Sequence, residues 1–138
     1  MALSTPILTS VKNYLGIHKE DDSFDEILVD NTKMSLLEMT DIGVIDDADG
    51  EPDFSEVTNK TTWEEVMRKL YPRLDSKVKN LLPYVETFIC ISVRLLFDPP
   101  ASQMILQMLK DKKNELTYRL NRHLDETTWT GGDKNGRD

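Results

Sequence analysis

Apolar residues are densest in the second half of the chain, where positions 88–97 read FICISVRLLF. At 100° per residue, most of the large apolar side chains of residues 83–97 fall on one arc about 200° wide. The members of this arc are Tyr84, Val85, Phe88, Ile89, Ile91, Ser92, Val93, Leu95 and Leu96. A helix this apolar must be contacted from two or three sides. The pattern therefore predicts a buried central helix that begins at Pro83.

The run ends at Asp98, Pro99 and Pro100, and we expect these residues to break the helix. An aspartate can accept the free N–H groups of a new helix, and a proline just inside a helix start gives up an N–H that had no partner. The next helix is predicted over residues 99 or 101 to about 124. Its apolar stripe consists of Ile105, Leu109, Leu116, Leu120 and Leu124.

Before the centre, the spacing predicts a first helix over residues 6–15, with Thr5 as its cap and Pro6 at its first position. Gly16 suits a left-handed exit from this helix. A second helix starts after a cap at Asp22 or Ser23, with Glu26 placed as in a capping box, and extends to residue 41.

The second helix has a mixed stripe: Phe24, Ile27 and Leu28, followed by Asn31, Ser35 and Glu38. A mixed face is typical of a helix shared between the core and a partner, and a kinked or ordinary core helix is the alternative. Residues 46–60 are acidic and rich in turn formers, which predicts a long loop.

A third helix is predicted to follow a capping box formed by Thr62 and Glu65. It should bury Trp63, Val66, Met67 and Leu70. A short helix with Leu74, Val78, Leu81 and Leu82 then leads to the central helix. The predicted fold is all-α, a small bundle of four to five helices with a long C-terminal helix. We expect residues 1–125 to form one helical domain and residues 126–138 a flexible tail.

The net charge of −8 is unevenly distributed: residues 1–56 carry 14 acidic and three basic residues, whereas residues 57–138 carry 11 acidic and 14 basic residues. Such asymmetry permits head-to-tail attraction between copies. An acidic protein is a poor candidate for gripping the phosphates of duplex DNA. The one cysteine, Cys90, fits a reducing compartment and a place in the core. No apolar run reaches the length of a membrane span, and no secretory signal is apparent.

The sequence contains few candidates for catalytic or metal-binding residues. The acidic loop resembles a calcium loop, but its first ligand position would be Ile45, and Pro52 occupies a normally apolar position. His18 and His123 have no recognisable catalytic or metal-binding spacing. We therefore predict no catalytic residue, metal site or cofactor, and a domain made for interaction. Tyr118, on the polar face of the last helix, and Trp129, in the tail, are either partner contacts or incidental exposed aromatics.

Two stretches together resemble the head–tail connector (adaptor, or head-completion) proteins of tailed bacteriophages. The first is VKNYLGI at residues 11–17 followed by DDSFDEIL at residues 21–28. The second spans residues 81–121 and includes Phe97, Asp98, Pro99 and Pro100. In that family a short helix, an acidic turn and a helix open the chain, and a buried helix, a proline turn and a long helix close it.

The resemblance implies a structural virion protein that forms a ring, commonly a dodecamer, on the portal protein. Such a ring extends the DNA channel and carries the stopper or tail-completion protein at the virion neck, after synthesis in the host cytoplasm. DNA would pass through without tight binding. The portal contact would use Tyr118, Arg119, Arg122 and Trp129. Two alternatives remain at this point: a small cytoplasmic regulator that binds one protein, and a metal-dependent nuclease built from the loop acids.

Overall fold

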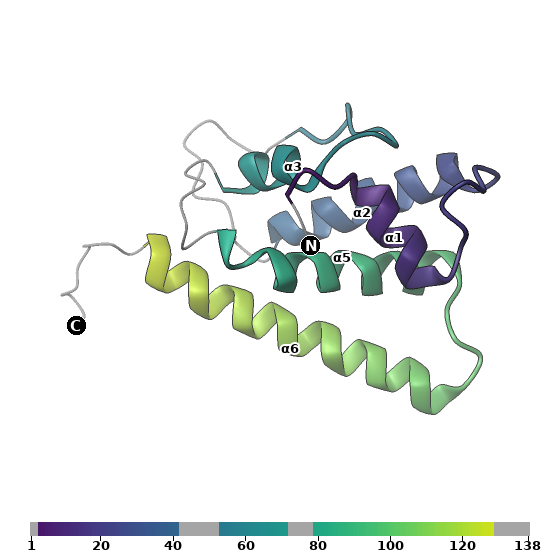
Figure 1. Cartoon of the computed structure of the whole chain (residues 1–138). Coiled ribbons are helices and arrows are strands. Elements are labelled where there is room, and N and C mark those ends of the chain that lie inside the picture. Colours follow the sequence, from purple (N-terminus) through teal and green to yellow (C-terminus); the bar gives the residue numbers. More distant parts are fainter. Residues whose placement is uncertain (1–2, 42–52, 72–78, 129–138) are drawn as a thin grey trace.

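The computed structural model describes residues 3–41, 53–71 and 79–128, and this part of the chain folds into five helices without a strand (Figure 1). The helices are α1 (Ile7–Leu15), α2 (Asp25–Asp41), α3 (Trp63–Leu70), α5 (Leu82–Phe97) and α6 (Gln103–Thr128). The predicted all-α bundle with a long C-terminal helix is confirmed. The predicted short helix before the centre lies mostly outside the described residues, and the division into a domain and a tail stays a prediction.

Helix α5 is the centre of the bundle and packs against α1, α2 and α6 (Figure 1). Its middle, from Phe88 to Val93, is buried on all sides. Leu96 of the predicted arc is exposed, whereas Cys90, which lies off the arc, is buried as predicted for a core residue. Cys90 is covered because α1 lies against it, with its Sγ 3.9 Å from the carbonyl oxygen of Ser10.

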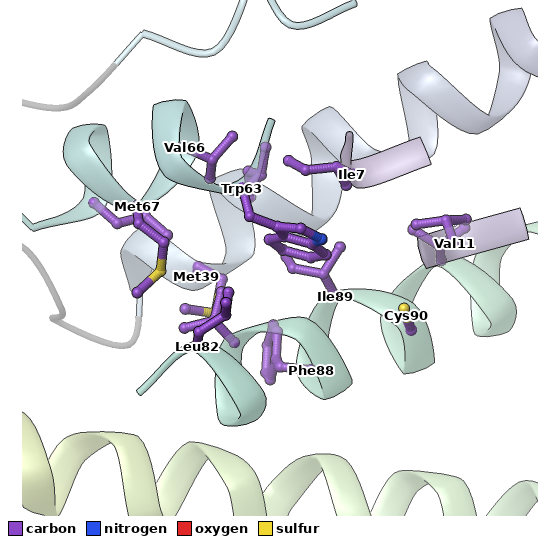
Figure 2. Close-up of a cluster of buried hydrophobic side chains, with 14 of the residues drawn as sticks. Ile7, Val11, Met39, Trp63, Val66, Met67, Leu82, Phe88, Ile89 and Cys90 are labelled. Atoms are coloured by element: carbon purple, nitrogen blue, oxygen red, sulfur yellow. The ribbon is translucent and has the colours of Figure 1, made fainter. Parts of the chain in front are cut away.

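Helix α3 closes another side of the core, and its capping box is confirmed. The Thr62 side chain accepts a hydrogen bond from the Glu65 N–H, and the Glu65 carboxylate accepts one from the Thr62 N–H. The four predicted side chains of α3 are buried. Figure 2 shows Trp63 pointing from α3 toward Ile89 of α5. Its indole N–H donates to the Ser10 hydroxyl over 2.9 Å.

The first turn of α1 differs from the prediction. The cap is Pro6, in extended conformation, and the helix begins at Ile7. Thr5 is not the cap because the segment before α1 is held beside the start of α3: the Thr5 carbonyl accepts from the Trp63 N–H over 3.1 Å. At the other end Gly16 is left-handed, as predicted, with φ of 79°.

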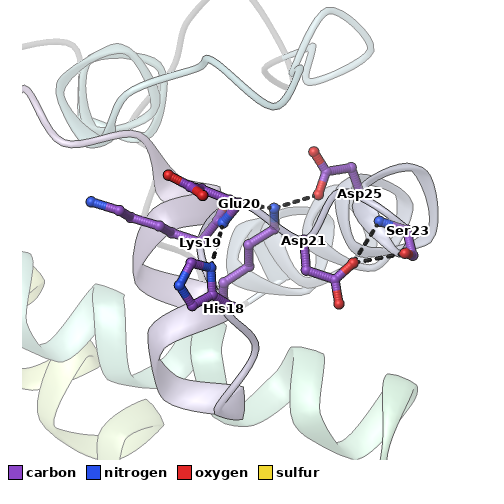
Figure 3. A network of polar contacts seen from close by, with 7 residues as sticks. His18, Lys19, Glu20, Asp21, Ser23 and Asp25 are labelled. Carbon is purple, nitrogen blue, oxygen red and sulfur yellow. Dashed lines mark hydrogen bonds and ion pairs between the residues drawn. The ribbon is translucent and has the colours of Figure 1, made fainter.

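Helix α2 ends at Asp41 as predicted, but it begins later than predicted, and its mixed stripe is buried only in part, at Leu28 and Ser35. The helix begins at Asp25, and the Ser23 hydroxyl donates to Asp21 rather than completing a capping box (Figure 3). Phe24 and Ile27 of the predicted stripe are exposed. The buried side chains are Leu28, Thr32, Ser35, Leu36 and Met39. They follow the helical repeat and face the bundle, where α5 packs on α2.

The described half of the acidic loop, residues 53–60, is anchored in the core. Phe54 and Val57 are buried, and the Lys69 ammonium donates to the Asp53 carbonyl over 2.9 Å. The signal for this anchor was available in the sequence as two apolar residues three apart in a polar segment. Residues 46–52 of the loop lie outside the described residues.

The helix break after α5 is confirmed, but the start of α6 was predicted too early. Asp98 is the C-cap of α5, and its N–H donates to the Arg94 carbonyl over 2.9 Å. Each of the two prolines disfavours helical conformation in the residue before it. Helix α6 begins only at Gln103, and its first turn is capped by Ser102 and not by Asp98. The Ser102 hydroxyl accepts a hydrogen bond from the Ile105 N–H over 3.3 Å. The helix continues to Thr128, four residues beyond the expected end.

Candidate docking surfaces

Helix α6 packs against the bundle around Leu116 and Leu120. Leu116 and Leu120 are buried, as their positions in the predicted stripe require. Lys113 lies between them and the exposed start of the helix, with its ammonium 2.7 Å from the Glu38 carboxylate of α2. The same ammonium lies 5.3 Å from the centre of the Phe88 ring of α5. Three helices thus meet at Lys113.

The first two turns of α6 are exposed, although they are apolar. Met104 is 74% exposed, Met108 61% and Ile105 45%. We call these three residues the α6 apolar start. Ile105 was predicted to continue the buried stripe, but the bundle covers the stripe only from the half-buried Leu109 onward, where α6 packs on α5.

The side chains predicted to meet the portal lie on the accessible side of α6. Tyr118 is 63% exposed, and Arg119 and Arg122 are exposed as well. The Arg119 guanidinium donates to Glu115 over 3.0 Å, and this bond raises the pKa of Arg119 and lowers that of Glu115. One of the two predicted cations, Arg119, is therefore engaged within its own helix. Trp129 lies outside the described residues.

A second exposed apolar surface lies on α2 and was missed in the sequence. Ile27 and Leu37 are each 49% exposed, and Met34 between them is 57% exposed. We call these three residues the α2 apolar strip. Their spacing of seven and three residues places them on one side of the helix, about 160° from the buried face. This spacing was visible in the sequence, but the mixed stripe that began at Phe24 concealed it.

The turn between α1 and α2 holds a polar network that joins the two helices (Figure 3). The buried Lys12 ammonium lies 2.6 Å from an Asp25 carboxylate oxygen and donates to the Lys19 carbonyl over 3.3 Å. The His18 imidazole accepts from the Glu20 N–H over 3.2 Å. A shallow groove of about 400 Å³ lies beside this turn and includes His18 in its lining. The network fixes α1 against α2.

The buried ionisable groups also favour structure over chemistry. Burial raises the pKa of the Cys90 thiol to about 12, which leaves it neutral and unreactive at physiological pH. Burial likewise raises the pKa of Glu86, its neighbour on α5. Within residues 3–41, 53–71 and 79–128, no three His, Cys, Asp or Glu residues are grouped to hold a metal ion. None of the helices in this part of the chain is long and apolar enough to cross a membrane.

The chain matches a known protein family over most of its length. The family model described as "Phage connector protein" matches residues 7–127. This range runs from the first residue of α1 to the last turn of α6, so it includes both exposed apolar surfaces. Searches of curated proteins and of solved structures return no match.

Proposed function

Because the chain belongs to the phage connector protein family, we propose that it forms a ring that docks on the portal protein of a tailed bacteriophage. The ring extends the DNA channel and provides the platform for the stopper or tail-completion protein. The protein is made in the host cytoplasm and becomes part of the virion neck. This role needs no cofactor and no catalytic step.

The proposal is supported by the contrast between the buried helix α5 and the partly exposed helix α6. The core buries α5 among its neighbours, while α6 presents exposed side chains between Gln103 and Arg122. A rigid domain with unpaired apolar side chains at its surface is typical of a component of an assembly. The family match supplies the kind of assembly.

The portal contact is proposed on the outer side of α6, at Tyr118, Arg119 and Arg122, and on Trp129 beyond it. Tyrosine, tryptophan and arginine are the residue types that most often anchor protein interfaces. The chain as a whole carries a net charge of −8, so DNA that passes through the ring is repelled rather than held.

The test is to mix the protein with purified portal rings and count bound copies by native mass spectrometry and electron microscopy. We expect a ring of connector subunits on each portal. Arg122→Glu combined with Tyr118→Ser should weaken docking at least tenfold, while Lys110→Glu, an exposed position about 80° around the helix from Tyr118 and about 120° from Arg122, should dock like the parent. A monomer that ignores portal rings contradicts the proposal. A low-order complex with one cytoplasmic protein would favour the regulator alternative instead.

A further inference from the structure

The two exposed apolar surfaces belong to different helices of one chain and have opposite electrostatic surroundings. We propose that neighbouring copies join head to tail, with the α6 apolar start of one copy packed on the α2 apolar strip of the next. This contact rests on the proposed ring-forming role and specifies how the ring is made.

The apolar side chains of both surfaces are exposed to solvent. Most of the large apolar side chains that are exposed in the described residues belong to these two surfaces. Neither surface covers the other within one copy, since all six side chains are at least 45% exposed. Gathered apolar side chains of this kind mark interaction sites. Three of the six are methionines, whose flexible side chains adapt well to an interface.

Charge selects the partner. Helix α2 contains five acidic residues and one lysine, and the exposed Glu26 and Asp30 lie beside the α2 apolar strip. Helix α6 contains five basic and two acidic residues up to Arg122, and Lys112 lies on the same side as the α6 apolar start. An α2 surface therefore attracts an α6 surface, and two α2 surfaces repel each other.

Symmetry then explains the ring. A contact between two different surfaces of identical chains is heterologous, and it closes into a ring when the rotation between copies permits. Each copy uses its α6 apolar start toward one neighbour and its α2 apolar strip toward the other. The outer side of α6 around Tyr118 remains accessible for a different partner.

A mixing experiment tests the pairing. Met34→Lys disables the α2 apolar strip, and Met104→Gln with Met108→Gln disables the α6 apolar start without adding a charge that could pair with the new lysine; lysine and glutamine favour helices, and all three changes replace exposed residues. We expect neither variant to form rings alone. Mixed together, the two variants retain one intact pair of surfaces and should form a one-to-one dimer in native mass spectrometry. Asn80→Lys, an exposed position outside both surfaces, should form rings like the parent.

Cross-linking on the portal gives a second measurement. In a Cys90→Ala background, a chain with both Met34→Cys and Met108→Cys should form a ladder of covalent oligomers when oxidised on portal rings. The two single-cysteine chains should give no covalent product, not even a disulfide-linked dimer. Rings from either surface variant, or a disulfide-linked dimer of one single-cysteine chain, would overturn the pairing and leave the proposed function intact. A parent that forms no ring and ignores the portal would instead contradict the proposed function.

Discussion

Helices α5 and α6 pack against each other and are joined by residues 98–102 (Figure 1). They differ in how much of their apolar side chains is buried. Helix α5 buries almost every large side chain in its middle, from Phe88 to Val93. Helix α6 buries Leu116 and Leu120 but leaves Met104 and Met108 largely exposed. The apolar side chains of α5 therefore stabilise the fold, whereas those at the start of α6 are available to another chain.

The physical reason is the number of neighbours that each helix has. Helix α5 is contacted by α1, α2 and α6, and Trp63 of α3 points toward it (Figure 2). Helix α6 is contacted along one side, and its first two turns extend past the part that the bundle covers. The loss of stability expected from a substitution therefore depends on how deeply the replaced side chain is buried.

The largest expected effect belongs to the surroundings of α5. Trp63→Ala removes a fully buried side chain and its hydrogen bond to Ser10. We expect the free energy of unfolding to fall by about 3–5 kcal/mol, measured by urea denaturation. Trp63→Phe keeps most of the packing and should cost clearly less. Equal losses for the two variants would show that the indole hydrogen bond, and not burial, dominates at this site.

A matched pair on α6 tests the two halves of that helix directly. Leu120→Ala should cost about 2–5 kcal/mol because Leu120 is fully buried. Met108→Ala should change the stability of the monomer by no more than about 0.5 kcal/mol because Met108 is exposed. Urea denaturation of both variants at low protein concentration makes the comparison. A large loss for Met108→Ala would mean that the start of α6 contributes to the core.

A smaller effect is expected at Lys113, where the two halves of α6 meet. Lys113→Met removes the ion pair with Glu38 and the cation–π contact with Phe88, and should cost about 1 kcal/mol. Lys110→Met, an exposed lysine one turn earlier, should cost almost nothing. The loss at Lys113 should shrink in high salt, since salt screens the part that comes from the ion pair. A loss that does not depend on salt would assign the effect to packing alone.

The final prediction concerns reactivity rather than the free energy of unfolding at neutral pH. At pH 8 a thiol reagent should modify Cys90 of α5 at least a hundredfold more slowly than a cysteine placed at Met108, because Cys90 is buried and its thiol stays neutral. Folding favours the neutral thiol, whose pKa rises from 9.0 to about 12. The contribution of Cys90 to stability is therefore complete below pH 9 and is lost as the pH rises toward 12. Rapid modification of Cys90 in the folded protein would show that α1 opens.

Local rules predicted much of the fold correctly. The capping box of α3, its four buried side chains, the left-handed Gly16 and the break at Asp98 each depend on residues close in sequence. Predictions failed where a distant segment decided the outcome. Thr5 lost its role as a cap because its carbonyl pairs with Trp63. Part of the candidate docking surface was likewise predictable: the exposure of Tyr118 followed from its place on the polar side of α6, but the exposure of Ile105 did not.

The helices, their order and the very apolar central helix were predictable from local patterns, because helical periodicity, caps and prolines act within a few residues. The sequence also indicated the connector family, which the match over residues 7–127 confirms. Which apolar residues remain exposed became clear only from the packing of the helices. Ile27 and Leu28 are adjacent and equally apolar, yet Leu28 is buried and Ile27 is exposed. Burial depends on which neighbour covers each side of a helix, and that is a property of the assembled bundle.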